Sequence, residues 1–166
     1  MTSPDHPFER SPPVNVHGTV VVIGTHGILF VGRSGSGKSS LALTCLETAR
    51  HAGLFSSLVA DDQVFIEHAG DHIIATRPPT TAGLIEVRYS GIAGIESISA
   101  ARLHMVVVLV SPGEAERLPP DAETHVLQGV ELPCLRLSVD ASAPFSVISG
   151  FISWRLASLQ NCDSHF

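Results

Sequence analysis

The sequence is poor in basic residues, and its only lysine is Lys38. It has 10 Lys and Arg residues against 16 Asp and Glu, which gives a formal net charge of −6 at pH 7. A nucleic-acid-binding surface needs clustered Lys and Arg to neutralise phosphates, whereas the basic residues here are scattered along the chain. We therefore expect no nucleic-acid partner.

The chain also lacks the features of membrane-spanning and secreted proteins. Its longest apolar run, Met105 to Val110, is far too short to cross a bilayer, and the N-terminus has no pattern of a secretory signal. Its 3 cysteines are an odd number without C-x-x-C spacing, which predicts reduced thiols rather than disulfides or a zinc site. We therefore expect a cytoplasmic protein with no membrane partner.

The composition that remains is that of a single globular domain. The chain has 166 residues, of which 44% are hydrophobic and 16% are charged, so it can bury a sizeable core. Residues 1–13 contain several prolines among polar residues, which predicts a flexible leader. We expect residues 14–160 to form one domain and residues 161–166 to form a loose tail.

The most informative stretch is an octapeptide that fits the phosphate-binding pattern G-x-x-x-x-G-K-[ST]. It consists of Gly32, Arg33, Ser34, Gly35, Ser36, Gly37, Lys38 and Ser39. In such a P-loop, backbone N–H groups and a helix N-terminus surround the phosphates. Lys38 would reach the β- and γ-phosphates of ATP, and the Ser39 hydroxyl would bind Mg²⁺. The alternative, a Gly/Ser-rich turn that only caps a helix, does not require a strand before it.

The flanking residues supply the structural context of a P-loop. Residues 27–31 are apolar and predict a buried strand, and residues 39–52 predict a helix with an apolar face. A further β-branched run over residues 14–23 predicts another strand. Because only a short turn at residues 24–27 separates the two strands, we expect an antiparallel hairpin before the loop.

Asp61 and Asp62 follow the apolar residues 58–60. Acids at the end of an apolar strand resemble a Walker B element, in which one carboxylate supports the metal and its neighbour can act as a base. Successive strand residues point to opposite sides, so the two acids should differ in role. A solvated turn after a strand is the alternative.

The remaining sequence predicts a mixed α/β domain. We expect further strands at residues 64–67, 72–76, 84–89, 105–110, 123–127 and 132–139, a short helix around residues 97–101, and a C-terminal helix over residues 145–159.

The order of these segments resembles a known family. The segments that carry the resemblance are His17-Gly18, Gly27, the P-loop, Val59 to Asp62, and Ile85 to Arg88 with Gly91-Ile92. They are similar to the catalytic domain of the bifunctional HPr serine kinase/phosphorylases, bacterial enzymes that phosphorylate a serine of the phosphocarrier HPr and reverse the reaction by phosphorolysis. The resemblance implies the P-loop fold of the HPr kinase/phosphoenolpyruvate carboxykinase type, a mixed sheet with flanking helices. It also implies ATP, Mg²⁺, HPr or an HPr-like protein as partner, and a homo-oligomer, a hexamer in the family.

The resemblance also implies roles for individual residues. Lys38 would bind phosphate, and Ser39 and Glu86 would hold Mg²⁺. Either Asp61 or Asp62 would take the proton from the target serine; we favour Asp62, with Asp61 orienting the metal ligands.

Two further residues receive roles from the same resemblance. His17 would lie beside the base and position it, whereas Arg88 would contribute to both directions of the reaction. From spacing alone, Glu86 and Arg88 could equally form a surface ion pair.

The chain also departs from the family pattern. We expect a short form without the N-terminal domain of full-length members, and residues 139–144 stand where the family has a Pro-Gly-Arg-Asn segment. The core residues for the kinase direction are present, whereas the late arginine associated with phosphorolysis is not. Two other functions therefore stay open, a nucleotide-binding regulatory module with reduced catalysis and a small-molecule kinase on the same core.

Overall fold

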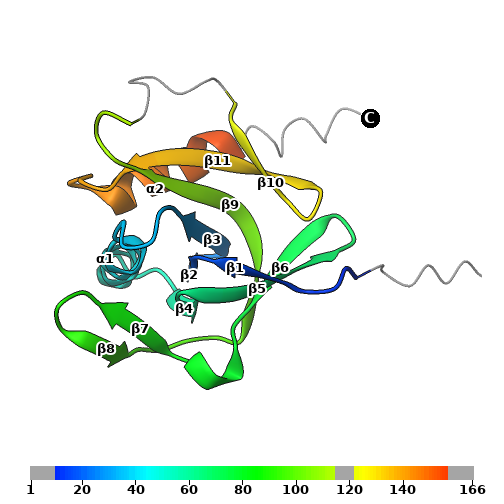
Figure 1. The fold of residues 1–166 in the computed structure, drawn as a ribbon. Coiled ribbons are helices and arrows are strands. Elements are labelled where there is room, and N and C mark those ends of the chain that lie inside the picture. Colours follow the sequence, from blue (N-terminus) through cyan, green and yellow to red (C-terminus); the bar gives the residue numbers. More distant parts are fainter. Residues whose placement is uncertain (1–9, 115–121, 157–166) are drawn as a thin grey trace, which may run out of the picture.

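The computed structural model describes residues 10–114 and 122–156 (Figure 1). The described residues leave out most of the expected leader, the expected tail and Cys162. Ser11, within the expected leader, exchanges hydrogen bonds with His68. Among the described residues, no helix is long and apolar enough to cross a membrane. Cys45 and Cys134 are free and buried, so the described thiols form no disulfide.

Nine strands form one curled mixed sheet, in the order β1-β5-β6-β9-β3-β2-β4, with β11 beside β9 and β10 beside β11 (Figure 1). Strands β7 and β8 form a separate two-stranded sheet. The strands are β1 (Val14–His17), β2 (Thr19–Ile23), β3 (His26–Val31), β4 (Ser56–Ala60), β5 (Gln63–Ala69), β6 (His72–Thr76), β7 (Leu84–Val87), β8 (Gly91–Gly94), β9 (Ala100–Val110), β10 (Thr124–Leu127) and β11 (Val130–Ser138). The helices are α1 (Lys38–His51), the short 3₁₀ helix η1 (Pro79–Thr81), α2 (Pro144–Phe151) and the π-helical turn η2 (Ile152–Leu156).

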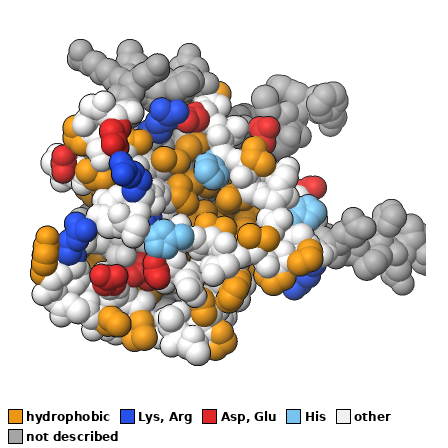
Figure 2. Space-filling view, in the orientation of Figure 1, with side chains coloured by type: hydrophobic (Ala, Val, Ile, Leu, Met, Phe, Trp, Pro, Cys, Tyr) orange, Lys and Arg blue, Asp and Glu red, His pale blue; other side chains and the backbone are white. Residues whose placement is uncertain are grey.

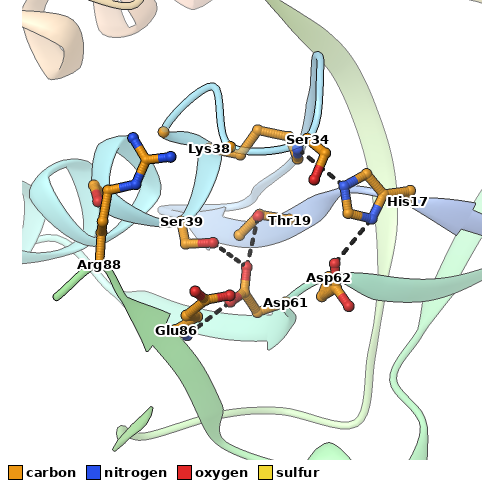
Figure 3. A pocket seen from close by; sticks show the side chains of 12 residues that line it. His17, Thr19, Ser34, Lys38, Ser39, Asp61, Asp62, Glu86 and Arg88 are labelled. Atoms are coloured by element: carbon orange, nitrogen blue, oxygen red, sulfur yellow. Dashed lines mark hydrogen bonds and ion pairs between the residues drawn. The ribbon is translucent and has the colours of Figure 1, made fainter. Parts of the chain in front are cut away.

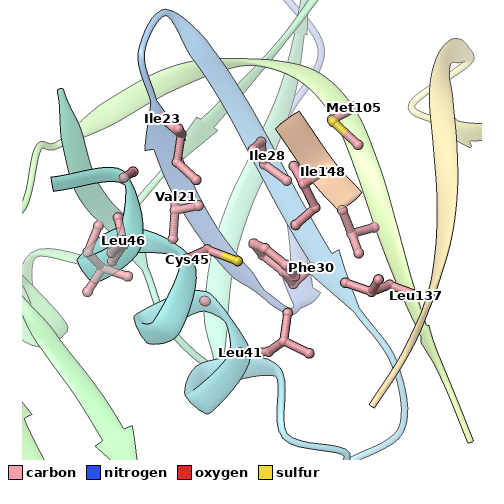
Figure 4. Packing of buried hydrophobic residues seen from close by; sticks show 14 of the residues in the cluster. Val21, Ile23, Ile28, Phe30, Leu41, Cys45, Leu46, Met105, Leu137 and Ile148 are labelled. Carbon is pink, nitrogen blue, oxygen red and sulfur yellow. The ribbon is translucent and has the colours of Figure 1, made fainter. Parts of the chain in front are cut away.

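Both faces of the central strands are buried, because their alternating side chains enter two different apolar clusters. Figure 4 shows Val21, Ile28 and Phe30 packed against Leu41 of α1 and Ile148 of α2. The alternate residues of β2 and β3 point the other way, into a cluster made only of strand residues. The helices therefore cover one face, and the curled sheet closes over the other.

Several predictions from the sequence are confirmed. The hairpin of β2 and β3 is antiparallel, and α1 follows the P-loop. The strands expected at residues 64–67 and 72–76 are present as β5 and β6, which pair with each other as a second hairpin. Gly53, just after α1, has φ +75°, a left-handed conformation that commonly ends helices. The mixed α/β fold expected from the sequence is the fold observed.

The prediction of one strand over residues 14–23 was wrong. The chain breaks at Gly18: β1 pairs with β5, whereas β2 pairs with β3 and β4. A Cβ atom at Gly18 would lie 2.8 Å from both the Leu29 side chain and the Phe30 carbonyl oxygen. The close backbone approach where the strand changes partners therefore needs glycine.

The prediction of a short helix near residues 97–101 was also wrong. Ser97 forms a β-bridge with Leu58, and β9 begins at Ala100. More exposed and buried residues alternate from Arg102 to Met105, which is the period of a strand, and Met105 to Val107 are all buried in the centre of the sheet. The expected C-terminal helix is present as α2, which passes into the π-helical turn η2 at Ile152. Residues 157–159 of that prediction lie outside the described part.

Candidate active site

The sheet order brings the motif residues to one place. Strand β2 is antiparallel to β3 on one side and to β4 on the other, so β3 and β4 run in the same direction. The carboxyl ends of β3 and β4 therefore flank the start of β2, where His17 and Thr19 lie. The P-loop leaves the end of β3 and the two acids leave the end of β4, so both border one pocket (Figure 3).

The P-loop wraps around the ammonium group of Lys38. Gly35 and Gly37 have φ angles of +73° and +95°, which glycine adopts without a steric penalty. Lys38 is only 6% exposed. Its Nζ lies 3.3 Å from the Gly32 carbonyl oxygen, 3.2 Å from the Arg33 carbonyl oxygen and 3.2 Å from His17 Nε2. The cation is therefore held inside the loop.

Asp61 is the buried carboxylate of the site, at 6% exposure. Its Oδ1 accepts hydrogen bonds of 2.7 Å from the hydroxyl groups of both Thr19 and Ser39. Its Oδ2 accepts a hydrogen bond of 2.9 Å from the backbone N–H of Glu86. These donors fix the carboxylate against the P-loop serine, because hydrogen bonds to an ionised acceptor are strong and directional.

Asp62 lies on the exposed side of the pocket, with 65% of its side chain exposed. Its backbone φ of +67° turns the chain away from β4, so the two acids point in different directions (Figure 3). Oδ1 of Asp62 lies 2.9 Å from His17 Nδ1. Because His17 Nε2 faces the donor Lys38, a neutral His17 carries its proton on Nδ1 and donates to Asp62.

Glu86 and Arg88 come from the end of β7 and the turn that follows, and both line the pocket. Arg88 lies over the P-loop, since a Cβ atom at Gly35 would be 2.9 Å from its Nη2. Although the structure describes both residues, no ion pair joins Glu86 to Arg88. Their placement therefore does not match the simple surface pair that spacing alone allowed.

Most residues singled out from the sequence meet in this pocket. Those that line it are His17, Ser34, Gly35, Gly37, Lys38, Ser39, Asp61, Asp62, Glu86 and Arg88. Three P-loop residues do not line it, namely Gly32, Arg33 and Ser36. The Arg33 side chain instead forms an ion pair of 3.2 Å with Glu114.

Sequence reasoning missed Thr19, which is fully buried and bound to the central carboxylate. The only signal in the sequence is a hydroxyl group within an otherwise apolar strand. That signal could not identify a partner 42 positions away.

The oxygen donors at the base of the pocket suit a hard divalent cation. Asp61, Ser39 and Glu86 supply carboxylate and hydroxyl oxygens. Within the described residues, no group of three or more His, Cys, Asp or Glu side chains gathers as a complete metal cage. Mg²⁺ typically uses one or two carboxylates and takes its other ligands from water and phosphate, so the residues present fit it.

Comparisons with known proteins agree with the geometry. Residues 9–158 match the family model described as the HPr Serine kinase C-terminal domain. An HPr kinase/phosphorylase of Cupriavidus necator is 33% identical over 148 residues, which cover 83% of this chain and 44% of the relative. An HPr kinase/phosphorylase of Chlorobium phaeobacteroides is 34% identical over 144 residues, covering 80% of this chain and 43% of the relative. The chain thus spans less than half the length of these relatives.

A solved structure has the same fold. It is described as the Hpr(Ser) kinase/phosphatase from Coxiella burnetii, and it superposes with a TM-score of 0.73 at 20% sequence identity. The match covers 89% of this chain and 99% of that chain. The likeness extends over most of this chain, which establishes the P-loop kinase type of fold.

Proposed function

Because the chain belongs to the family of the HPr serine kinase C-terminal domain, we propose that it transfers the γ-phosphoryl group of ATP to a serine of HPr or a similar phosphocarrier protein. We place this reaction in the cytoplasm. One observation carries the proposal: a P-loop lysine, a buried carboxylate on the P-loop serine and an exposed carboxylate on a histidine share one pocket. A phosphate-binding site alone would not need the exposed acid.

The P-loop and Lys38 bind the phosphates of ATP. In the structure, the Lys38 ammonium group donates to two carbonyl oxygens of the loop and lies beside His17 Nε2. When the nucleotide binds, the ammonium group turns toward its β- and γ-phosphates. Arg88 already lies over Gly35, so a second cation is close to the same anion. Two positive groups around the phosphates stabilise the charge that develops during transfer.

Ser39, Asp61 and Glu86 hold Mg²⁺ at the base of the pocket. The ion neutralises phosphate charge when it is bound. Asp61 orients the Ser39 hydroxyl through their 2.7 Å hydrogen bond, and its buried position keeps both groups in place before the nucleotide arrives. Preorganised ligands of this kind reduce the reorganisation needed in the transition state.

Asp62 is the base for the incoming serine. Its carboxylate is exposed and reachable by a protein substrate, while His17 holds it at 2.9 Å. The bond between the γ-phosphorus and the bridging oxygen of ATP breaks, a bond forms from the serine oxygen to that phosphorus, and the serine proton moves to Asp62. The products are ADP and phosphoserine.

We propose transfer from ATP as the main direction of the reaction. Residues 139–144, which replace the family's Pro-Gly-Arg-Asn segment, connect β11 to the first residue of α2, Pro144, and contribute no residue to the pocket. Among the described residues, Arg88 is the arginine that lines it. Phosphorolysis of phosphorylated HPr should therefore be slow or absent.

The test is to incubate the protein with γ-labelled ATP, Mg²⁺ and purified HPr and to locate the label. Label on an HPr serine supports the proposal, and Lys38→Ala should abolish it because the phosphate loses its buried cation. Persistent labelling of HPr by that variant would contradict the assignment. Tight nucleotide binding without transfer would favour a regulatory module, and label on a metabolite would favour a small-molecule kinase.

Sedimentation of the same sample tests the proposed homo-oligomer, a hexamer by family resemblance.

A further inference from the structure

The hairpin of β7 and β8 has two faces with different surroundings. Ile85 pairs with Ala93, and Ile85 is 1% exposed in the core against α1. Glu86 pairs with Ile92 on the opposite face, because directly opposed residues in an antiparallel pair share a face. Since Glu86 lines the pocket, the outward face of the hairpin continues from the pocket wall.

The outward face carries large apolar side chains that the described residues leave exposed. Ile92 is 73% exposed, Tyr89 at the tip is 99% exposed, and Leu84 beside Glu86 is 39% exposed. In Figure 2, apolar side chains lie at the edge of the molecule where Figure 1 places this hairpin, next to charged side chains. Exposed apolar residues that adjoin a site commonly mark a binding surface.

Tyr89 occupies a backbone position that is unfavourable for its side chain. The N–H of Ser90 donates to the Val87 carbonyl oxygen at 2.9 Å, which closes a β-turn, and Tyr89 at the third position has φ +65°. A turn with positive φ at this position favours glycine or asparagine. The Arg88 guanidinium, 5.9 Å from the ring centroid, is the aromatic contact found for Tyr89 among the described residues. The fold itself therefore gives little reason for an aromatic residue there.

We propose that Tyr89 and Ile92 form a docking surface for the protein substrate of the kinase. The inference rests on the proposed function and extends it to the kind of partner surface: a folded protein whose reacting serine lies beside an apolar patch. The argument for this occupant is continuity, because a serine that reaches Asp62 brings its neighbouring residues over the same pocket rim as Glu86 and Arg88. A nucleotide is not the expected occupant, since neither Tyr89 nor Ile92 lines the pocket. Exposed tyrosines are frequent anchors in protein interfaces.

The test uses two single variants and a matched control. Tyr89→Asn removes the ring and keeps a residue that tolerates positive φ, and Ile92→Thr keeps β-branching while removing apolar surface. Val126→Thr makes the same kind of change on β10, where Val126 is 59% exposed and away from the pocket. Initial rates are measured against HPr concentration and, separately, against ATP concentration. Thermal unfolding shows whether each variant is folded.

The expected result is a KM for HPr raised about tenfold in Tyr89→Asn, which corresponds to about 1.4 kcal/mol, and raised less in Ile92→Thr. The KM for ATP stays within about twofold, and Val126→Thr matches the wild type. An unchanged KM for HPr in folded Tyr89→Asn and Ile92→Thr would overturn the docking surface alone. A raised KM for ATP with an unchanged KM for HPr would assign Tyr89 to the nucleotide and would also overturn it. If the wild-type protein transfers no phosphate to HPr, the proposed function fails, and the docking surface fails with it.

Discussion

Replacing Thr19 by valine tests the buried carboxylate at the centre of the site. The substitution keeps the shape of the side chain but removes the hydroxyl that donates to Asp61 Oδ1 at 2.7 Å. Thr19 is 0% exposed and Asp61 is 6% exposed, so water cannot readily replace the lost donor. Hydrogen bonds to charged groups contribute about 1.5–3 kcal/mol. We expect the free energy of unfolding to fall by an amount in that range.

The same variant should also alter the Mg²⁺ dependence of the proposed phosphoryl transfer. Asp61 Oδ1 would keep only the Ser39 hydroxyl as a donor from a side chain, so the pair at the base of the pocket becomes less fixed. We expect a higher Mg²⁺ concentration for half-maximal activity. Direct titration of the protein–nucleotide complex with Mn²⁺, followed by its paramagnetic effect on water protons, should show the same weakening without relying on turnover.

A matched control distinguishes the loss of the hydrogen bond to Asp61 from the general effect of replacing threonine by valine. Thr44 is exposed on α1, and its hydroxyl donates to the Ser40 carbonyl oxygen. Thr44→Val should change stability by less than about 0.5 kcal/mol, as surface substitutions usually do. If Thr19→Val were equally silent in chemical denaturation, and the Mg²⁺ dependence stayed unchanged, the reasoning about the Asp61 network would be refuted.

Two further predictions concern the acids and the pH dependence of stability. Asp62→Asn should lower kcat at least about 100-fold, since a general base contributes at that scale, with little loss of stability because its side chain is 65% exposed; near-normal kcat in HPr phosphorylation assays would reassign the base. Burial, followed by the nearby His26, lowers the pKa of His104 to about 4 from its usual value of 6.5, and His104 Nδ1 accepts a hydrogen bond from the Gly27 N–H at 3.0 Å. The depressed pKa favours the neutral ring, so its contribution to folding is present above about pH 6.5 and is lost as the pH falls toward 4. Urea unfolding between pH 7 and 4 should show this slope, and His104→Gln should reduce it; an equal slope in the variant would exclude His104 as its source.

Features that depend on residues only a few positions apart could be predicted from the sequence. The P-loop, α1 and the antiparallel hairpin before them follow from glycine placement, apolar periodicity and a short turn. The acids at the end of β4 were also recognisable, because an apolar run ending in carboxylates is a local pattern. Their surroundings differ, with Asp61 buried and Asp62 exposed, whereas the different roles expected of them stay a prediction.

Contacts between distant segments could not be predicted in the same way. The chain breaks at Gly18 because β1 and β2 pair with different strands. Residues 100 and 101 belong to β9 rather than to a helix, because β9 pairs with β6 and β3. Thr19 was missed for the same reason, since its function depends on a carboxylate 42 positions away. Strand pairing of this kind is decided by burial on both faces of the sheet, which no local pattern encodes.

The sequence by itself therefore determined that this chain has a loop of the phosphate-binding pattern, a pair of acids and the segment order of its family. Only the tertiary structure decided how they meet. Strand β2 lies between β3 and β4, which brings Thr19 and Ser39 to Asp61, and β1 pairs with β5, which brings His17 to Asp62. The physical reason is that motif residues are set by local backbone geometry, whereas the hydrogen bonds that orient them form between strands that the hydrophobic core brings together.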